Sequence, residues 1–145
     1  MGMLVLAAVW LFLWQVGGLQ RRAELATLKS TVGALRTALV LDHLRVQAAA
    51  GPGAVGTTQH NPFGLLQSKP VNYLGEMGLL QAIESAPGSW VFDRECVCIA
   101  YLPVDPQWHA APNGGGLITY RVVTASQVPQ LRAMAAYRWQ GQLLD

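Results

Sequence analysis

The sequence predicts an α+β protein in which a long N-terminal helix packs on a small antiparallel sheet. Two observations lead to this prediction. An apolar stretch at the N-terminus continues without a break into an amphipathic repeat, and segments rich in β-branched and aromatic residues follow after residue 88. A chain of 145 residues is typical of one domain with an appendage, so both patterns belong to a single small protein.

The first element is a predicted transmembrane helix over residues 3–19. This stretch contains no Asp, Glu, Lys or Arg, and Gln15 is its one strongly polar side chain. Trp10 and Trp14 are spaced about one helical turn apart. A buried core helix would normally show a polar face, and a cleaved secretory signal would normally carry basic residues before its apolar part. We therefore expect a single-pass membrane anchor.

The charges near this span predict its orientation. Basic side chains follow the span, at Arg21, Arg22, Lys29 and Arg36, and none precedes it. Because cytoplasmic flanks of membrane helices carry the excess of Lys and Arg, this count favours a domain in the cytoplasm. The family resemblance described below favours the opposite side, so the sequence leaves the topology open.

Residues 20–50 continue the helix as an amphipathic spine. Apolar side chains recur at intervals of three and four residues, and Asp42 occupies the one position that the repeat leaves unfilled. The apolar set is Leu25, Leu28, Val32, Leu35, Leu39 and Val46. A Gly-Pro-Gly sequence at 51–53 predicts that the helix ends at about residue 49. The chain's own sheet, a partner helix or both would cover this stripe.

Residues 51–145 are predicted to form a small, loop-rich antiparallel β domain. Three strands are expected, the first two as a hairpin, over 89–93, 96–102 and 117–124. Residues 131–139 fit either a strand or a short helix, with the strand favoured. A helical turn is expected near 77–84, whereas the Gly- and Pro-rich residues 51–62 are expected to be loop.

The sequence contains no recognisable catalytic, cofactor-binding or metal-binding arrangement. A net charge of +2, without a basic stripe interleaved with aromatics, argues against nucleic acid as a partner. The glycine run at 114–116 lacks the following Lys-Ser/Thr of a phosphate-binding loop and is typical of a turn. The histidines at 43, 60 and 109 stand far apart, with no cysteine at zinc-site spacing. We expect a protein that is not an enzyme and uses no metal or cofactor.

The two cysteines, Cys96 and Cys98, would point to the same face of an extended strand. A disulfide between them would close a very small ring, so the sequence favours two reduced side chains that pack on the strand. Asp93 and Glu95 beside them are expected to be solvated turn residues.

Four short motifs occur in an order that is typical of one protein family. They are NPFGLL at 61–66, PVNYLGE at 70–76, PGSWVFD at 87–93 and IAYL at 99–102. Together with the helical segment 31–39, they resemble the soluble part of pilin-like proteins, the pseudopilins, of bacterial type II secretion and type IV pilus systems. The resemblance covers roughly residues 20–124.

The resemblance implies a non-enzymatic subunit or accessory protein that is anchored in the inner membrane, has a periplasmic domain and assembles by helix-helix packing. Its partners would be membrane lipid and other pilin-like or secretion-system subunits. The expected packing positions are Trp10, Trp14, Leu25, Leu28, Val32, Leu35 and Leu39. The family-like positions, implied to be structural, are Asn72, Tyr73, Glu76, Trp90, Phe92 and Asp93. Processed members carry a glutamate in the apolar helix, and residues 3–19 contain none, so an accessory protein remains open.

Two other classes of function remain as alternatives. One is a membrane-tethered binding module, unrelated to filaments, whose sheet recognises a ligand or an envelope partner. The other is a membrane-anchored enzyme that uses Cys96 or Cys98. Truncation of the span would abolish assembly but not ligand binding by the domain, and a Cys→Ser change would abolish only a thiol-dependent activity.

Overall fold

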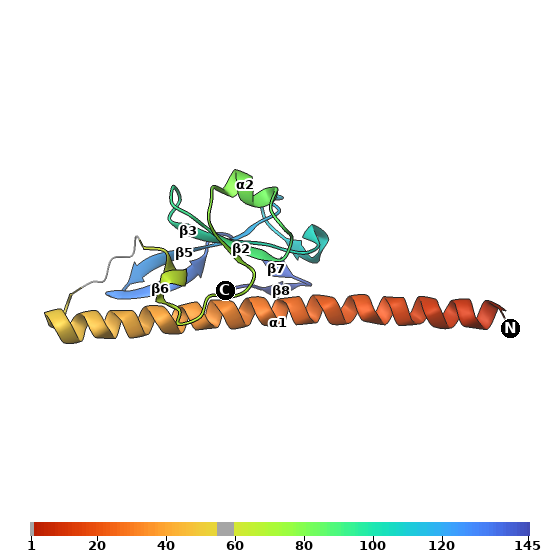
Figure 1. Cartoon of the computed structure of the whole chain (residues 1–145), viewed down its shortest axis with the longest axis horizontal. Helices are drawn as coiled ribbons and strands as arrows, with labels where there is room; N and C mark the ends of the chain where they lie inside the picture. The colour runs from red at the N-terminus through yellow and green to blue at the C-terminus, as the bar shows by residue number, and fades with distance from the viewer. Residues whose placement is uncertain (1, 55–59) are drawn as a thin grey trace. The chain divides into compact units, whose positions relative to one another are not determined.

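The computed structural model describes residues 2–54 and 60–145 (Figure 1). One long helix, α1, is followed by a small β domain, which confirms the predicted α+β class. The described chain forms two compact units, one up to Ser30 and one from Thr31 onwards. We describe each unit by itself.

Helix α1 runs without interruption over Gly2–Ala50, as the sequence predicts. It ends because Gly51 adopts a left-handed backbone conformation, with φ of +93°. The N–H of Gly51 donates to the carbonyl of Gln47 at 2.9 Å, which satisfies one of the last carbonyls of the helix. Pro52 follows and cannot continue the helical hydrogen bonding.

The first unit contains the apolar part of α1. Among the described residues, α1 is the one helix that is long and apolar enough to cross a membrane, and none of its most apolar stretch is buried. A core helix with this composition would be mostly buried, whereas a signal sequence meets the same criteria of length and composition. The chain therefore has one candidate membrane span.

The second unit contains residues 31–50 of α1 and a five-stranded sheet in the order β1-β2-β3-β5-β6. The strands are β1 (Tyr73–Glu76), β2 (Ser89–Asp93), β3 (Cys98–Leu102), β5 (Ile118–Ala125) and β6 (Val128–Ala133). The pairs β2–β3, β3–β5 and β5–β6 are antiparallel. The three strands predicted from sequence therefore correspond to β2, β3 and β5.

Strand β1 makes the sheet mixed and not purely antiparallel. It pairs parallel with β2, with Tyr73 opposite Trp90 and Glu76 opposite Phe92. A short helix, α2 (Leu79–Ile83), lies between β1 and β2 in the chain, in the predicted helical region. This connection returns the chain to the same end of the sheet, as parallel pairing requires. Four residues with an internal glycine gave too weak a strand pattern for sequence analysis to detect β1.

The two faces of the sheet are both covered near its centre, since every residue of β2 and β3 is buried. On one face, Trp90 packs against Tyr101, with ring centroids 4.8 Å apart. On the other face, Val91 and Ala100 form a small cluster with Ala82 of α2. Residues 31–50 of α1 and helix α2 thus lie on opposite sides of the sheet (Figure 1).

Strand β6 forms a hairpin with β5, and the short strands β7 (Arg138–Trp139) and β8 (Gln142–Leu143) that follow belong to a second sheet. The turn between β5 and β6 consists of Ser126 and Gln127, which both have positive φ angles, of +52° and +69°.

The second sheet contains β4 (His109–Ala110), β7 and β8, in the order β4-β7-β8. Two short 3-10 helices, η1 (Pro62–Leu65) and η2 (Pro106–Trp108), complete the fold. The single strand expected over 131–139 is therefore divided between β6 and β7.

Candidate functional site

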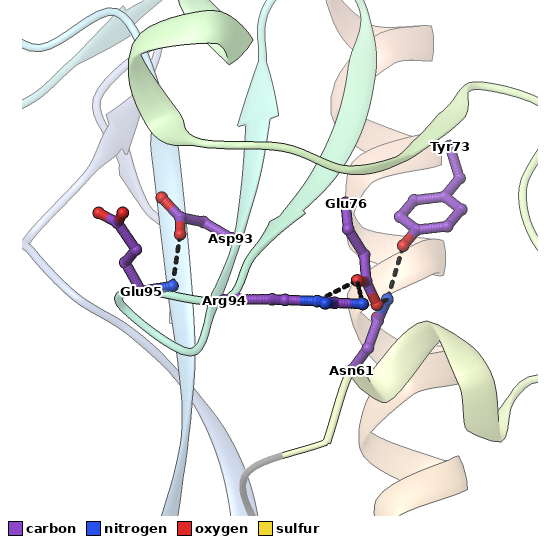
Figure 2. A network of polar contacts seen from close by, with 6 residues as sticks. All are labelled: Asn61, Tyr73, Glu76, Asp93, Arg94 and Glu95. Atoms are coloured by element: carbon purple, nitrogen blue, oxygen red, sulfur yellow. Dashed lines mark hydrogen bonds and ion pairs between the residues drawn. The ribbon is translucent and has the colours of Figure 1, made fainter.

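A network of polar side chains joins the loop before β1 to the sheet (Figure 2). Asn61 is its centre. Its side-chain oxygen accepts a hydrogen bond from the N–H of Phe63 at 3.1 Å, which caps η1. Its side-chain nitrogen donates to the hydroxyl of Tyr73 at 2.7 Å and to Oε1 of Glu76 at 3.2 Å. One amide side chain therefore fixes both η1 and β1.

Glu76 also forms an ion pair with Arg94, which lies in the turn between β2 and β3 (Figure 2). The hydrogen bond from Asn61, and then the hydrogen bond and charge of Arg94, lower the pKa of Glu76 below its ordinary value. The pair is exposed to solvent, so it positions the turn more than it stabilises the fold.

Aromatic rings lie beneath this polar network. Phe63, fully buried, stacks on Tyr73 with ring centroids 4.2 Å apart and meets Trp90 edge-on at 5.9 Å. Partial burial raises the pKa of Tyr73 above its ordinary value, against the opposite effect of the Asn61 hydrogen bond. The NPF segment therefore belongs to the core of the β domain.

Asp93 is buried, and the expectation that it is a solvated turn residue is wrong. Its Oδ2 accepts from the N–H of Leu79, at the start of α2, at 2.9 Å. Its Oδ1 accepts from the N–H of Glu95 at 2.7 Å. Satisfying two backbone donors offsets the cost of burying this carboxylate. Glu95 itself is exposed, and its carboxylate points away from Arg94 and Glu76 (Figure 2).

Cys96 and Cys98 form a disulfide, which corrects the expectation of two reduced cysteines on a strand. Only Cys98 lies in β3, whereas Cys96 lies in the preceding turn. Val97 between them has a φ of +51°, and this left-handed residue brings the two Cα atoms within 5.2 Å. A catalytic thiolate, as the enzyme alternative requires, would need a thiol that this disulfide does not leave free.

The six family-like positions lie around β1 and β2. The side-chain nitrogen of Asn72 donates to the carbonyl of Gly88 at 2.7 Å, and the backbone carbonyl of Asn72 accepts from the N–H of Trp90 at 2.9 Å. Trp90 and Phe92, on one face of β2, are buried. Each polar member of the set therefore forms at least one hydrogen bond that holds a backbone segment or another side chain in place. Within the described residues no three His, Cys, Asp or Glu side chains gather as metal ligands.

The predicted packing positions on α1 differ in burial. Trp10 and Trp14 are exposed, and Leu25 is partly exposed. The buried members of the set are Leu28, Val32, Leu35 and Leu39. His43, which the sequence pattern did not include, continues the buried stripe, because the step after Leu39 is four residues and not three.

A second face of α1 escaped sequence analysis. Gly33, Thr37, Val40, Leu41 and Leu44 are all exposed and recur at helical spacing on the side away from Leu35. This exposed face carries no charged side chain. A Cβ at Gly33 would meet nothing within 4 Å. The apolar residues at 40, 41 and 44 could have revealed this face in the sequence. They were overlooked because the apolar repeat at 28, 32, 35 and 39 is more regular.

Comparison with protein families, with curated proteins and with solved structures finds no match for this chain. The fold and these sites therefore define its class by themselves. It is an α+β protein with one candidate membrane span, a β domain in which Asn61 links η1 to β1, and an exposed apolar face on α1.

Proposed function

We propose that this chain is a non-enzymatic, pilin-like subunit or accessory protein of a bacterial type II secretion or type IV pilus assembly. In this proposal α1 anchors it in the inner membrane, and it assembles by helix-helix packing. The observation that carries the proposal is the exposed face of α1 formed by Gly33, Thr37, Val40, Leu41 and Leu44. An uncharged apolar face on a helix whose opposite face is already buried is typical of a protein interaction site.

The composition of the exposed face suits a second helix. Gly33 and Thr37 lie one turn apart, and small residues at this spacing allow two helix backbones to approach closely. The hydroxyl of Thr37 donates to the carbonyl of Gly33 within the same helix at 3.0 Å, so its methyl group is left for packing. Leu41 and Leu44 add the apolar area that stabilises the contact.

The disulfide supports an orientation with the β domain in the periplasm. Disulfides persist in the bacterial periplasm and are rare in the cytoplasm. This argument opposes the count of positive charges after the span. A fused reporter that is active only in the periplasm, placed after Asp145, tests it, with a cytoplasm-active reporter at the same site as the control. Activity of the cytoplasmic reporter alone would refute this orientation and the pilin-like function with it.

Cross-linking between copies in bacterial membranes tests the assembly. A photo-reactive amino acid at Leu41 is expected to yield cross-linked oligomers of the full chain. Leu44→Asp should reduce them strongly, because it places a charge on the exposed face. Ala49→Asp is the matched control, since residue 49 is also exposed but lies off this face. Cross-links that tolerate Leu44→Asp as well as Ala49→Asp would contradict helix packing.

A membrane-tethered binding module is the second candidate. It is favoured by an apolar cleft with a volume of about 550 Å³ beside strand β6, a size within the range of ligand-binding pockets. This candidate predicts a chain that stays monomeric in membranes with or without Leu44→Asp. Sedimentation of the full chain in mild detergent distinguishes the two candidates.

A further inference from the structure

The cleft beside β6 lies within the unit that begins at Thr31. It is bordered by α1, by the edge strand β6 and by the last residues of the chain. Val40, Ala136 and Leu143 contribute exposed apolar surface. Arg36 and Arg132 line the cleft with positive charge and Asp145 lines it with negative charge. Its volume of about 550 Å³ is enough for several side chains of a partner.

The edge of β6 that borders this cleft is a poor template for an added strand. With a two-residue turn after β5, residues 128, 130 and 132 direct their backbone groups to β5, and 129, 131 and 133 direct theirs outward. Pro129 has no N–H to donate. The carbonyl of Leu131 already accepts from Nε and Nη2 of Arg36, at 3.3 and 3.2 Å. The occupant is therefore a group of side chains and not an extended peptide.

Helix α2 lies on the side of the sheet opposite to residues 31–50 of α1 (Figure 1). It carries a ridge of exposed apolar side chains. Ala82 packs on Val91 and Ala100, and this contact fixes which side of α2 faces the sheet. Leu80 and Ile83 are spaced three residues apart and are 83% and 54% exposed. Glu84 follows them, is also exposed and forms no ion pair among the described residues. Such a ridge is costly to leave in water.

We propose that the ridge formed by Leu80 and Ile83 of one copy inserts into the cleft beside β6 of a second copy. Apolar side chains then fill an apolar cleft, and the carboxylate of Glu84 approaches the guanidinium group of Arg132. The guanidinium of Arg36 is already bound to the backbone oxygens of Leu131 and Asp145. This inference rests on the assembly function proposed above and adds a contact between β domains. Because ridge and cleft are different surfaces, the contact is heterologous, and the rotation between neighbouring copies sets whether it builds a ring or an open chain.

A photo-reactive amino acid at Gln81, which is exposed beside the ridge, tests the contact in membranes that contain the full chain. We expect cross-links to peptides from 128–136 or 143–145 of the second copy. Leu80→Asp on the ridge and Ala136→Trp in the cleft should each lower the yield about tenfold or more, since each removes the burial of a large apolar side chain. Val71→Asp, which adds the same charge at an exposed apolar residue outside α2, should leave the yield unchanged.

Mixing two variants tests whether the contact is heterologous. The Leu80→Asp chain has an altered ridge and an unaltered cleft, whereas the Ala136→Trp chain has an altered cleft and an unaltered ridge. Together they should form dimers but no longer oligomers, with the cross-link always running from the Ala136→Trp chain to the Leu80→Asp chain. In a further pair, Glu84→Arg should weaken the cross-link, and Arg132→Glu in the second copy should restore it. Cross-links that map outside the cleft, or that survive both Leu80→Asp and Ala136→Trp, would overturn the inference.

The helix cross-link from Leu41 is a separate readout. If it persists while Gln81 fails to cross-link to the cleft, the ridge-and-cleft contact is refuted and the pilin-like assembly stands. If the Gln81 cross-link behaves as expected while the Leu41 cross-link is absent, copies associate through their β domains and the helix-packing function is refuted.

Discussion

The guanidinium of Arg36 donates two hydrogen bonds to the backbone carbonyl of Leu131, which lies 95 residues further along the chain. It also donates to the backbone oxygen of Asp145. One side chain therefore ties α1 to the edge strand β6 and to the last residue of the chain. The same contact closes the edge of β6, so it contributes to stability and to protection against strand pairing.

Arg36→Met should destabilise the β domain by about 1–2 kcal/mol, because it removes charge-assisted hydrogen bonds and leaves the carbonyl of Leu131 without its partner. Urea unfolding of the full chain in detergent, followed by tryptophan fluorescence, measures this loss. Arg45→Met is the control, since Arg45 forms no hydrogen bond or ion pair among the described residues. Equal unfolding midpoints for the two variants would contradict the role of Arg36.

Asn61→Ala should lower the free energy of unfolding by about 1 kcal/mol, because the three hydrogen bonds of the Asn61 side chain that link η1 to β1 are lost. The pKa of Glu76 should then rise toward its ordinary value. A lowered pKa in the folded state stabilises the fold above the ordinary pKa, and this contribution is lost as the pH falls through the folded-state pKa. NMR titration of the Glu76 carboxyl checks the shift, and an unchanged pKa would show that Asn61 does not set it.

Gly88→Ala should cost about 1–2 kcal/mol, since residue 88 has a φ of +79°, a conformation that disfavours a Cβ. The added Cβ would also approach Cγ2 of Val104 to 3.1 Å. Gly64→Ala is the matched control, because its Cβ would meet nothing within 4 Å and its φ is not positive. Thermal unfolding of the two variants compares them directly, and equal melting temperatures would rule out the left-handed conformation.

Reduction of the Cys96–Cys98 disulfide should lower the free energy of unfolding by only about 1–2 kcal/mol, because the bond closes a short loop. Urea unfolding with and without a phosphine reductant measures the effect. The double variant Cys96→Ser, Cys98→Ser should not respond to the reductant. Labelling of both cysteines by an alkylating reagent under non-reducing, denaturing conditions would show that no disulfide forms.

Tyr120 should remain protonated when other tyrosines ionise. Burial raises its pKa to about 12, with the positive charge of Arg36 acting in the opposite direction. A raised pKa in the folded state stabilises the fold below the ordinary value of 10.0, and this contribution is lost as the pH rises toward 12. Wild type should therefore lose more stability between pH 9 and pH 11.5 than Tyr120→Phe, as measured by urea unfolding. Equal losses would mean that Tyr120 ionises normally.

The sequence was sufficient to predict the long helix, its end at the Gly-Pro-Gly segment and the strands β2, β3 and β5. These elements have strong local signals: an uninterrupted apolar and amphipathic pattern over α1, and β-rich segments bounded by turn residues. Trp90 and Phe92 lie on one buried face of β2, because alternation along a strand is a local property.

Other features depend on tertiary contacts. Strand β1 is stabilised by its parallel pairing with β2, and the turn at Ser126 and Gln127 lacks the Asn-Gly or Asp-Gly signal of a tight hairpin. Asp93 is buried because α2 and the following turn both supply N–H donors to it. The disulfide forms because Val97 turns the chain into a left-handed conformation.

The sequence by itself determined that a long helix precedes strands β2, β3 and β5, and it determined the uncharged span and the pattern of apolar residues along α1. Each of these depends on residues that are neighbours in the chain. Only the tertiary structure decided which side of residues 31–50 is covered. Both sides are apolar, and the sheet buries Val32, Leu35 and Leu39 while Leu41 and Leu44 remain exposed. The physical reason is that burial depends on what packs against a side chain, and that partner lies far away in sequence.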